Sequence, residues 1–297
     1  MKKQDTWLQL VCHTCRDNSE AIEAVMEDAG ALSITLQDAK DEPVLEPLPG
    51  EIPLWKELII IALFNENTDL GALTQTLKDN KNKWNISKLH TETLQDQDWE
   101  RVWMKDFHPM RFGDNLWIYP SNYETPDDDS VKIHLDPGLA FGTGTHPTTA
   151  LCLEWLDQHP PKGLKVVDYG CGSGILAVVA AKLGAKHIYA IDIDPQGLIA
   201  TKDNMQRNSI KSSRISCYLP DDFSSEPSDL VLANILCGPL LELYPLLSSL
   251  IRSESTLVLS GILEDQTNQV IDKYVSGFKD FKIQILDGWA RISATKI

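Results

Sequence analysis

At 297 residues the chain is longer than one hydrophobic core usually needs, so its length predicts two domains. It carries 27 Lys and Arg residues against 43 Asp and Glu, a net charge of −16, and such an acidic chain is unsuited to DNA, duplex RNA or an anionic membrane surface, which attract basic clusters. A basic partner is favoured, because opposite net charge raises the rate of encounter.

The first residues of the chain and the spacing of its cysteines indicate in which cellular compartment the protein is expected. Met-Lys-Lys-Gln-Asp-Thr-Trp is followed by no apolar run, so we expect no signal peptide, and stretches such as Leu58–Phe64 are far shorter than the ~20 residues of a membrane-spanning helix. Six irregularly spaced cysteines form no disulfide framework. Cys12 and Cys15 have C-x-x-C spacing, but without a second pair we expect no metal site. We therefore expect a cytoplasmic protein, and nothing in the sequence requires more than a monomer.

Residues 1–94 alternate short apolar runs with helical patterns. The expected order is strand, helix, strand, strand, helix, strand, at Trp7–Cys12, Ser19–Ala29, Ala31–Leu36, Leu58–Phe64, Leu70–Leu77 and Trp84–Leu89. Ser19 is the expected N-cap of the first helix, and Gly30 is expected to end it. This order is that of a small α+β ferredoxin-like sandwich, and we interpret residues 1–94 as a substrate-recognition domain.

A helix is predicted to connect this domain to the rest of the chain, over residues 95–107. Its apolar side chains form one stripe, made of Trp99, Val102, Trp103 and Phe107. We interpret residues 95–108 as a helical linker that packs between the domains, with a hinge as an additional role.

From residue 163 onward strands alternate with helices, a rhythm that predicts a doubly wound, mostly parallel α/β sheet. The seven expected strands are Leu164–Tyr169, Ile188–Ile193, Ile215–Leu219, Leu230–Ile235, Thr256–Leu259, Phe281–Leu286 and Trp289–Thr295. The helices are expected at Ile175–Leu183, Pro195–Asn208, Pro239–Ile251 and Asp265–Val275. Asp287-Gly288 is a hairpin signal, so the last two strands should be antiparallel. We assign residues 109–297 to this domain.

The strongest local signal is the run Asp168-Tyr169-Gly170-Cys171-Gly172-Ser173-Gly174, which joins a strand directly to a helix. Glycines there let the backbone approach a ligand and leave helix N–H groups free. Asp168 stands where a pyrophosphate would be repelled, and Asp192 ends the next strand, where a ribose hydroxyl is held in such folds. A ligand with a ribose, no phosphate and a cationic end fits both acids. S-adenosylmethionine is such a ligand, and we expect Asp168, Gly170, Gly172 and Asp192 to bind it.

A segment rich in glycine, proline and threonine, Asp136–Thr149, precedes a helix predicted at Ala150–Leu156, with Thr149 as its cap. Its place before the first sheet strand suits closure over the cofactor, and Phe141 and Gly142 are candidate contacts. His146 is a candidate general base, although a lone loop histidine is usually not catalytic.

Asn234 lies at the carboxyl end of the fourth predicted sheet strand and is the predicted catalytic residue. Ligands gather at the carboxyl ends of the strands in an open parallel sheet, so its amide oxygen is positioned to accept a hydrogen bond from an attacking amine. Asp221 and Asp222 follow the third strand, where they suit either an adenine amino group or simple solvation.

Four segments occur in one order: Phe107–Gly113, Asp136–Thr149, Asp168–Gly174 and Ala233–Leu236. Together they resemble a family of bacterial methyltransferases that modify the large-subunit ribosomal protein L11, and the likeness covers nearly the whole chain. The resemblance implies a class I methyltransferase fold and a cytosolic enzyme that N-methylates lysine side chains and the N-terminal amine of L11. By match to the family's motifs, it also implies cofactor contacts at Thr149, Gly170, Asp192 and Asn234.

Three other functions stay open. Class I methyltransferases that act on glutamine amides or base amines usually carry Asn-Pro-Pro-Tyr after the fourth strand, whereas Ile235 and Leu236 follow Asn234 here. A nicotinamide oxidoreductase with the spacing G-x-G-x-x-G would need glycine at position 175, which is Ile175. A non-catalytic ribosome-binding module that only senses the cofactor is the third.

Overall fold

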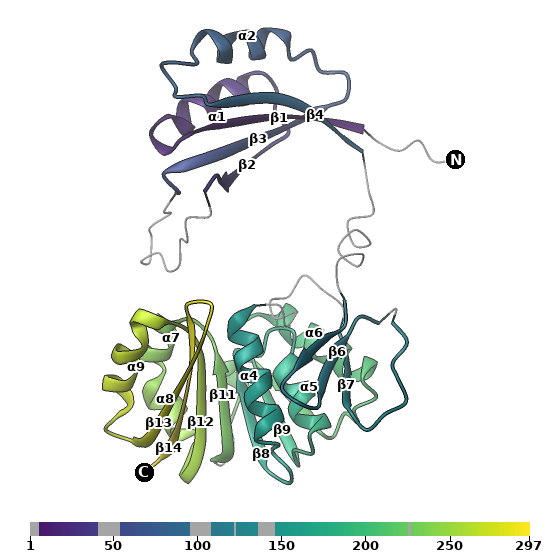
Figure 1. The fold of residues 1–297 in the computed structure, drawn as a ribbon, viewed down its shortest axis with the longest axis vertical. Helices are drawn as coiled ribbons and strands as arrows, with labels where there is room; N and C mark the ends of the chain where they lie inside the picture. Colours follow the sequence, from purple (N-terminus) through teal and green to yellow (C-terminus); the bar gives the residue numbers. More distant parts are fainter. Residues whose placement is uncertain (1–5, 41–53, 96–107, 122, 136–145, 225–226) are drawn as a thin grey trace. The chain divides into compact units, whose positions relative to one another are not determined.

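The computed structural model describes the whole chain except residues 1–5, 41–53, 96–107, 122, 136–145 and 225–226 (Figure 1). Contacts within the chain divide it into two units, Met1–Trp99 and Glu100–Ile297. The predicted connecting helix over residues 95–107 lies outside the described residues except for its first residue, Gln95, which belongs to a strand instead. The candidate contacts Phe141 and Gly142 also lie outside the described residues. The domain boundaries at 94 and 108 stay predictions.

The first unit is a four-stranded antiparallel sheet with two helices. Its elements are β1 (Thr6–Cys15), α1 (Ser19–Asp28), β2 (Ser33–Asp38), β3 (Glu57–Asn65), α2 (Gly71–Asp79) and β4 (Lys88–Gln95). The strand order is β2-β3-β1-β4, and every neighbouring pair is antiparallel. The two helices share one hydrophobic core with the sheet, which includes Leu10, Ile22, Met26, Phe64 and Leu77. The predicted order of the six elements is confirmed.

Most boundaries in this unit differ from prediction by one to three residues, and the last strand and the cap of the first helix were predicted wrongly. The last strand is not Trp84–Leu89 but β4, because Trp84 and Ile86 are buried core residues that precede the strand. The strand itself is mostly polar and exposed, and its backbone pairing with β1 forms it. Ser19 is the first residue of α1 rather than its cap, which is Asn18.

The second unit contains a seven-stranded sheet in the order β10-β9-β8-β11-β12-β14-β13. The strands are β8 (Lys165–Tyr169), β9 (His187–Ile191), β10 (Ile215–Tyr218), β11 (Ser228–Asn234), β12 (Ile251–Leu263), β13 (Phe278–Leu286) and β14 (Trp289–Lys296). The first five in this order are parallel, and β14 is antiparallel to β12 and β13. The predicted hairpin is confirmed: Asp287 and Gly288 both have positive φ, +49° and +76°, as a two-residue turn of the primed type requires.

Helices cover both faces of this sheet (Figure 1). They are α4 (Pro147–Gln158), α5 (Ile175–Lys182), α6 (Pro195–Arg207), α7 (Cys237–Glu242), α8 (Tyr244–Ser249) and α9 (Thr267–Tyr274). Because side chains alternate along a strand, β11 contributes side chains to two separate hydrophobic cores, one on each face of the sheet. Leu230 and Leu232 pack with α4, α5 and α6, whereas Val231 and Ala233 pack with α7, α8 and α9. The doubly wound prediction is therefore confirmed.

Several boundaries in the second unit differ from prediction. The single helix expected at Pro239–Ile251 is two short helices, because Pro245, in the first turn of α8, has no N–H with which to continue the hydrogen bonding of α7. Ile251 opens β12, which is much longer than Thr256–Leu259. Thr149 lies inside α4, whose N-cap is His146.

A small sheet that the sequence patterns did not predict precedes α4. It has the strands β5 (Met110–Phe112), β6 (Leu116–Tyr119) and β7 (Val131–His134). Leu116, Ile118 and Ile133 share a core with α4 and α5, so the small sheet packs against these helices. Strands of three or four residues are too short to show a period. Among the described helices, none combines the length and the apolar character that crossing a bilayer requires.

Candidate functional site

The loop between β8 and α5 is built on glycines with positive φ. Gly170, Gly172 and Gly174 have φ values of +75°, +51° and +74°, which glycine adopts without the steric cost that other residues incur. The N–H groups of Gly170 and Cys171 both donate to the carbonyl oxygen of Ile191, at 2.8 and 3.0 Å. This folds the loop across the carboxyl ends of β8 and β9, where the first turn of α5 begins.

Close packing gives a second reason for glycine in this loop. A Cβ on Gly170 would overlap the Cγ2 atom of Ile235, and a Cβ on Gly174 would lie 2.5 Å from the hydroxyl oxygen of Thr201. Thr201 Oγ1 donates to the carbonyl oxygen of Gly172 at 3.2 Å and so ties α6 to the loop. The loop is thus packed between Ile235 and Thr201. A side chain at Gly170 or Gly174 would fill the space beside the loop or displace these neighbours.

Asp192 follows β9 directly and is oriented by two backbone groups. Its Oδ2 accepts a hydrogen bond from the N–H of Gly172 at 2.7 Å, and its Oδ1 accepts one from the N–H of Asp194 at 2.9 Å. A carboxylate oxygen can accept more than one hydrogen bond, so both oxygens keep capacity for a ligand hydroxyl. The residue is half-buried beside the glycine loop, which suits the pair of hydroxyls on a ribose.

Asp168 is a buried carboxyl group with an unpaired oxygen. It is 1% exposed; its Oδ2 accepts a hydrogen bond from the N–H of Ala177 at 3.0 Å, and its Oδ1 has no partner within the described residues. The pKa of Asp168 is raised to about 7: burial raises it most, the Ala177 N–H opposes the rise, and the nearby charge of Asp192 adds to it. A cationic group placed beside this carboxyl would favour its charged form, so the residue fits a ligand with a positive end.

Asn234 and Thr149 meet from distant parts of the chain. Asn234 is the last residue of β11 and Thr149 is in the first turn of α4. The amide Nδ2 of Asn234 donates to the hydroxyl oxygen of fully buried Thr149 at 3.3 Å. This bond assigns the orientation of the amide, and within the described residues the amide oxygen has no partner. The oxygen is therefore available to accept a hydrogen bond at the carboxyl end of the sheet.

The backbone around Asn234 is fixed by β12. Ser260, which pairs with Asn234, donates from its hydroxyl to the carbonyl oxygen of Thr148 at 3.1 Å, linking β12 to α4. Gly261 has a φ of +85°, and a Cβ there would overlap the backbone carbonyl group of Ile235. The sequence patterns did not single out Ser260 or Gly261, although a glycine inside an apolar strand often marks a close backbone approach.

His146 has a structural role in this region. Its Nδ1 accepts a hydrogen bond from the N–H of Thr148 at 3.3 Å and lies 2.8 Å from the Thr148 hydroxyl oxygen, which makes it the side-chain cap of α4. The ring contacts Trp289 edge to face, with 4.9 Å between ring centroids. Burial lowers the pKa of His146, so the neutral form that a cap requires is favoured. Capping accounts for this histidine without a role as a base.

The structure brings most of the predicted site residues to one edge of the sheet. Hydrogen bonds and close packing join the glycine loop to Asp192 and to Ile235, and join Asn234 to Thr149. Asp221 and Asp222 are exposed in a short 3-10 turn after β10. Burial raises the pKa of the Tyr169 phenol, and the charges of Asp192 and Asp221 raise it further. The residues present fit S-adenosylmethionine: an unpaired buried carboxyl oxygen, an oriented carboxylate and a glycine cradle.

Comparisons with known proteins agree with this fit. The family described as Ribosomal protein L11 methyltransferase (PrmA) matches residues 6–297. The chain is 46% identical over 288 residues to the Ribosomal protein L11 methyltransferase of Haemophilus influenzae (strain PittEE), with 97% of each chain covered. It is 47% identical over 296 residues to that of Vibrio cholerae serotype O1 (strain M66-2), with 98% of this chain and 99% of the relative covered. A crystal structure of ribosomal protein L11 methylase from Lactobacillus delbrueckii subsp. bulgaricus is similar at 32% identity with a TM-score of 0.59, covering 64% of this chain and 99% of that one.

Proposed function

Because the chain belongs to the ribosomal protein L11 methyltransferase family, whose members use S-adenosylmethionine, we propose that it methylates lysine side chains and the N-terminal amine of ribosomal protein L11. The observation that carries the proposal is the Asn234 amide, which Thr149 holds at the carboxyl end of β11 and whose oxygen has no partner among the described residues. An amide oxygen in this position can accept a hydrogen bond from the N–H of a substrate amine.

The residues that would hold the cofactor come from three strand ends and one helix. S-adenosylmethionine supplies an electrophilic methyl group when it is bound. Asp192 is suited to the ribose hydroxyls, the backbone of Gly170 and Gly172 to close contact, and Asp168 to the cationic end. Thr149 and Asn234 complete this set, and Phe141 and Gly142, outside the described residues, remain proposed contacts.

Asn234 has to favour the neutral amine and hold it in place. A free lysine amine has a pKa near ~10.4 and is mostly protonated at neutral pH, so a site that uses it must favour the neutral form. Partial burial disfavours the ammonium ion, and the Asn234 oxygen accepts a hydrogen bond from an amine N–H, which directs the nitrogen lone pair. Orientation of this kind can lower a barrier by roughly 7–11 kcal/mol. The released proton can pass to water, so no strong base is required.

The first unit is proposed to recognise the substrate. Its β-α-β-β-α-β order and antiparallel strand order β2-β3-β1-β4 support a ferredoxin-like assignment. The net charge of −16 supports a basic protein partner and argues against nucleic acid. A reaction on a ribosomal protein supports a cytoplasmic location, and a monomer suffices for the proposal because one chain contains every residue that it uses.

One experiment separates this proposal from its alternatives. The purified chain is mixed with methyl-labelled S-adenosylmethionine and a ribosomal extract, and the label is then located by mass spectrometry. We expect label on lysine side chains and on the N-terminal amine of one small basic protein. Label in RNA would instead support a base-modifying enzyme, and cofactor binding without transfer would support a sensor.

Asn234→Ala tests the residue that carries the proposal. We expect a loss of turnover much larger than the loss of thermal stability, because the substitution removes the acceptor without opening a core cavity. Unchanged turnover in the folded variant would rule out a catalytic role for Asn234.

A further inference from the structure

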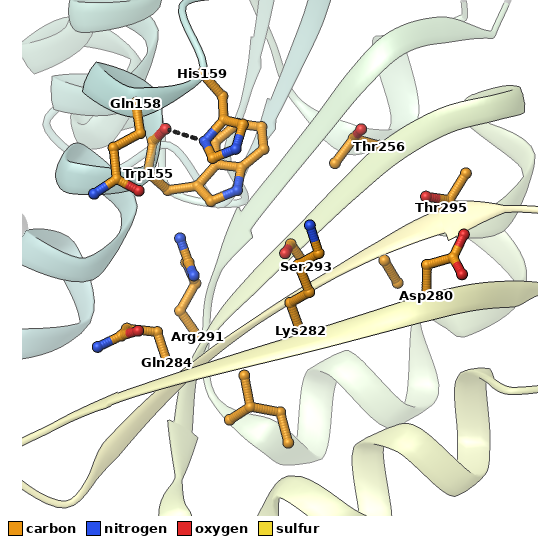
Figure 2. A pocket seen from close by; sticks show the side chains of 12 residues that line it. Trp155, Gln158, His159, Thr256, Asp280, Lys282, Gln284, Arg291, Ser293 and Thr295 are labelled. Atoms are coloured by element: carbon orange, nitrogen blue, oxygen red, sulfur yellow. Dashed lines mark hydrogen bonds between the residues drawn. The ribbon is translucent and has the colours of Figure 1, made fainter.

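A cavity lies away from the glycine loop, between the last turn of α4 and the strands β12, β13 and β14 (Figure 2). Its volume is about 650 Å³, within the range of small-molecule sites. The polar and aromatic lining includes Trp155, His159, Lys282, Gln284, Arg291 and Ser293. None of the predicted site residues contributes to it.

Strand register puts the two cations of this cavity on one face of the sheet. Arg291 pairs with Gln284 and Ser293 pairs with Lys282, so all four side chains lie on the same side of the β13–β14 ribbon. Lys282 and Arg291 are diagonal neighbours, a spacing of roughly 7–8 Å between backbones. Figure 2 shows both side chains reaching from the strands toward α4. Two like charges so placed repel each other unless an anion lies between them.

Arg291 is buried and forms no ion pair with any described residue. It is 9% exposed, its Nε has no hydrogen-bond partner, and it forms no ion pair within the described part of the chain. Burial lowers the pKa of Arg291, and Cys152 and Glu154 on α4 oppose this electrostatically, although Glu154 does not pair with it. A guanidinium stays charged in proteins, so burying it unpaired is costly. In a chain with a net charge of −16, this arrangement is unexpected unless a ligand supplies the missing anion.

The other lining groups suit an oxyanion. Gln158 and Gln284 carry amide donors, and Ser293 carries a hydroxyl. The Nδ1 of His159 donates to the carbonyl oxygen of Trp155 at 3.0 Å, and the two rings stack with centroids 4.6 Å apart, forming a flat wall. Asp280 is the one carboxylate among the lining residues, and Figure 2 shows it beside Thr295, at the other end of the cavity from Arg291.

We propose that this cavity binds the phosphate group of a small molecule between Arg291 and Lys282. Arg291 offers a planar fork of N–H donors that matches two phosphate oxygens, and Lys282 offers a mobile ammonium group. The cavity is larger than phosphate alone needs, which favours a phosphomonoester whose remaining part lies along the Trp155–His159 wall. The site is separate from the proposed methyl transfer and does not depend on it.

The test measures binding of inorganic phosphate and of glycerol 3-phosphate to the full chain by calorimetry in a phosphate-free buffer. We expect saturable binding at one site, and a roughly tenfold loss of affinity in Arg291→Gln and in Lys282→Gln. Tighter binding of glycerol 3-phosphate would identify an organic phosphate as the ligand, and equal binding would identify free phosphate. Absence of saturable binding of both probes would overturn the proposal.

Lys279→Gln is the matched control. Lys279 lies on the same strand, but its ammonium pairs with Glu254 at 2.7 Å and does not line the cavity. We expect this variant to bind phosphate with the affinity of the parent. If Lys279→Gln weakened phosphate binding as much as the two cavity variants, the effect would come from net charge alone, and the proposed site would be overturned. Saturation with S-adenosylhomocysteine should leave phosphate binding unchanged, and competition would overturn the separate location. Lys282 is exposed, so Lys282→Gln should fold even where Arg291→Gln does not.

Discussion

The backbone carbonyl of Ile235 occupies the space that a Cβ on Gly261 would fill. Ile235 follows Asn234 directly, and its side chain also reaches the place of a Cβ on Gly170. The residue after the proposed catalytic amide is therefore held between two glycines with positive φ, +75° and +85°. The position of Asn234 depends on both.

Gly261→Ala is expected to reduce turnover at least tenfold and to destabilise the fold by more than the ~1–3 kcal/mol of an unfavourable φ alone, because the added methyl group displaces Ile235. Gly288→Ala is the matched control, since Gly288 has a φ of +76° but nothing within 4 Å of a Cβ. Chemical denaturation and steady-state kinetics measure both effects. Equal effects of the two substitutions would contradict the packing argument.

Thr149→Val is expected to lower kcat about tenfold, because it removes the hydroxyl group that orients the Asn234 amide at nearly constant volume. Thr149→Ser keeps the hydroxyl and should restore most of the rate. Kinetics at saturating cofactor, with thermal melts as a folding check, give the comparison. If valine and serine lower kcat to the same extent, the hydroxyl does not position the amide.

Asp168→Asn is expected to change how stability depends on pH in the absence of cofactor. The folded-state pKa of about 7 lies above the ordinary value of 3.8, so the folded state keeps a proton that the unfolded state releases. This contribution to stability is complete below pH 4 and is lost as the pH rises to 7, by at most about 1.4 kcal/mol per pH unit. The asparagine variant should lack this slope in urea denaturation between pH 4 and 7, and parallel curves for the two proteins would contradict the raised pKa.

Asp192→Asn is expected to weaken binding of S-adenosylhomocysteine by tenfold or more, because it removes the charged acceptor proposed for the ribose hydroxyls. Asp194→Asn is the matched control in the same loop. Asp194 caps α6 by accepting a hydrogen bond from the N–H of Gln196 at 2.9 Å, and asparagine caps a helix about as well as aspartate, so Asp194→Asn should keep the affinity of the parent. Calorimetric titration of the two variants separates them, and comparable affinities would remove Asp192 from the cofactor site.

Predictions from the sequence were strongest where a local pattern and the tertiary fold agree. The strand before Gly170, the helix after Gly174 and the turn at Asp287-Gly288 each depend on neighbours in the chain, and each was predicted. Predictions failed where distant residues decide. Trp84 has an apolar side chain but packs as a core residue outside the strand, and β4 is a polar strand because β1 pairs with it.

Short-range spacing and residue type were enough to specify the alternation of strands and helices, the glycine loop with its two acids, and the family. Other relationships became visible in the folded chain alone: Thr149 orients Asn234 across 85 positions of sequence, Gly261 makes room for Ile235, and Arg291 is buried with no ion pair to a described residue. These relationships depend on which strands become neighbours, and no local pattern specifies that order. The net charge of −16 predicted a basic partner for the whole chain. The cavity at Arg291 has the opposite character, because its lining contains two basic side chains and one acidic side chain.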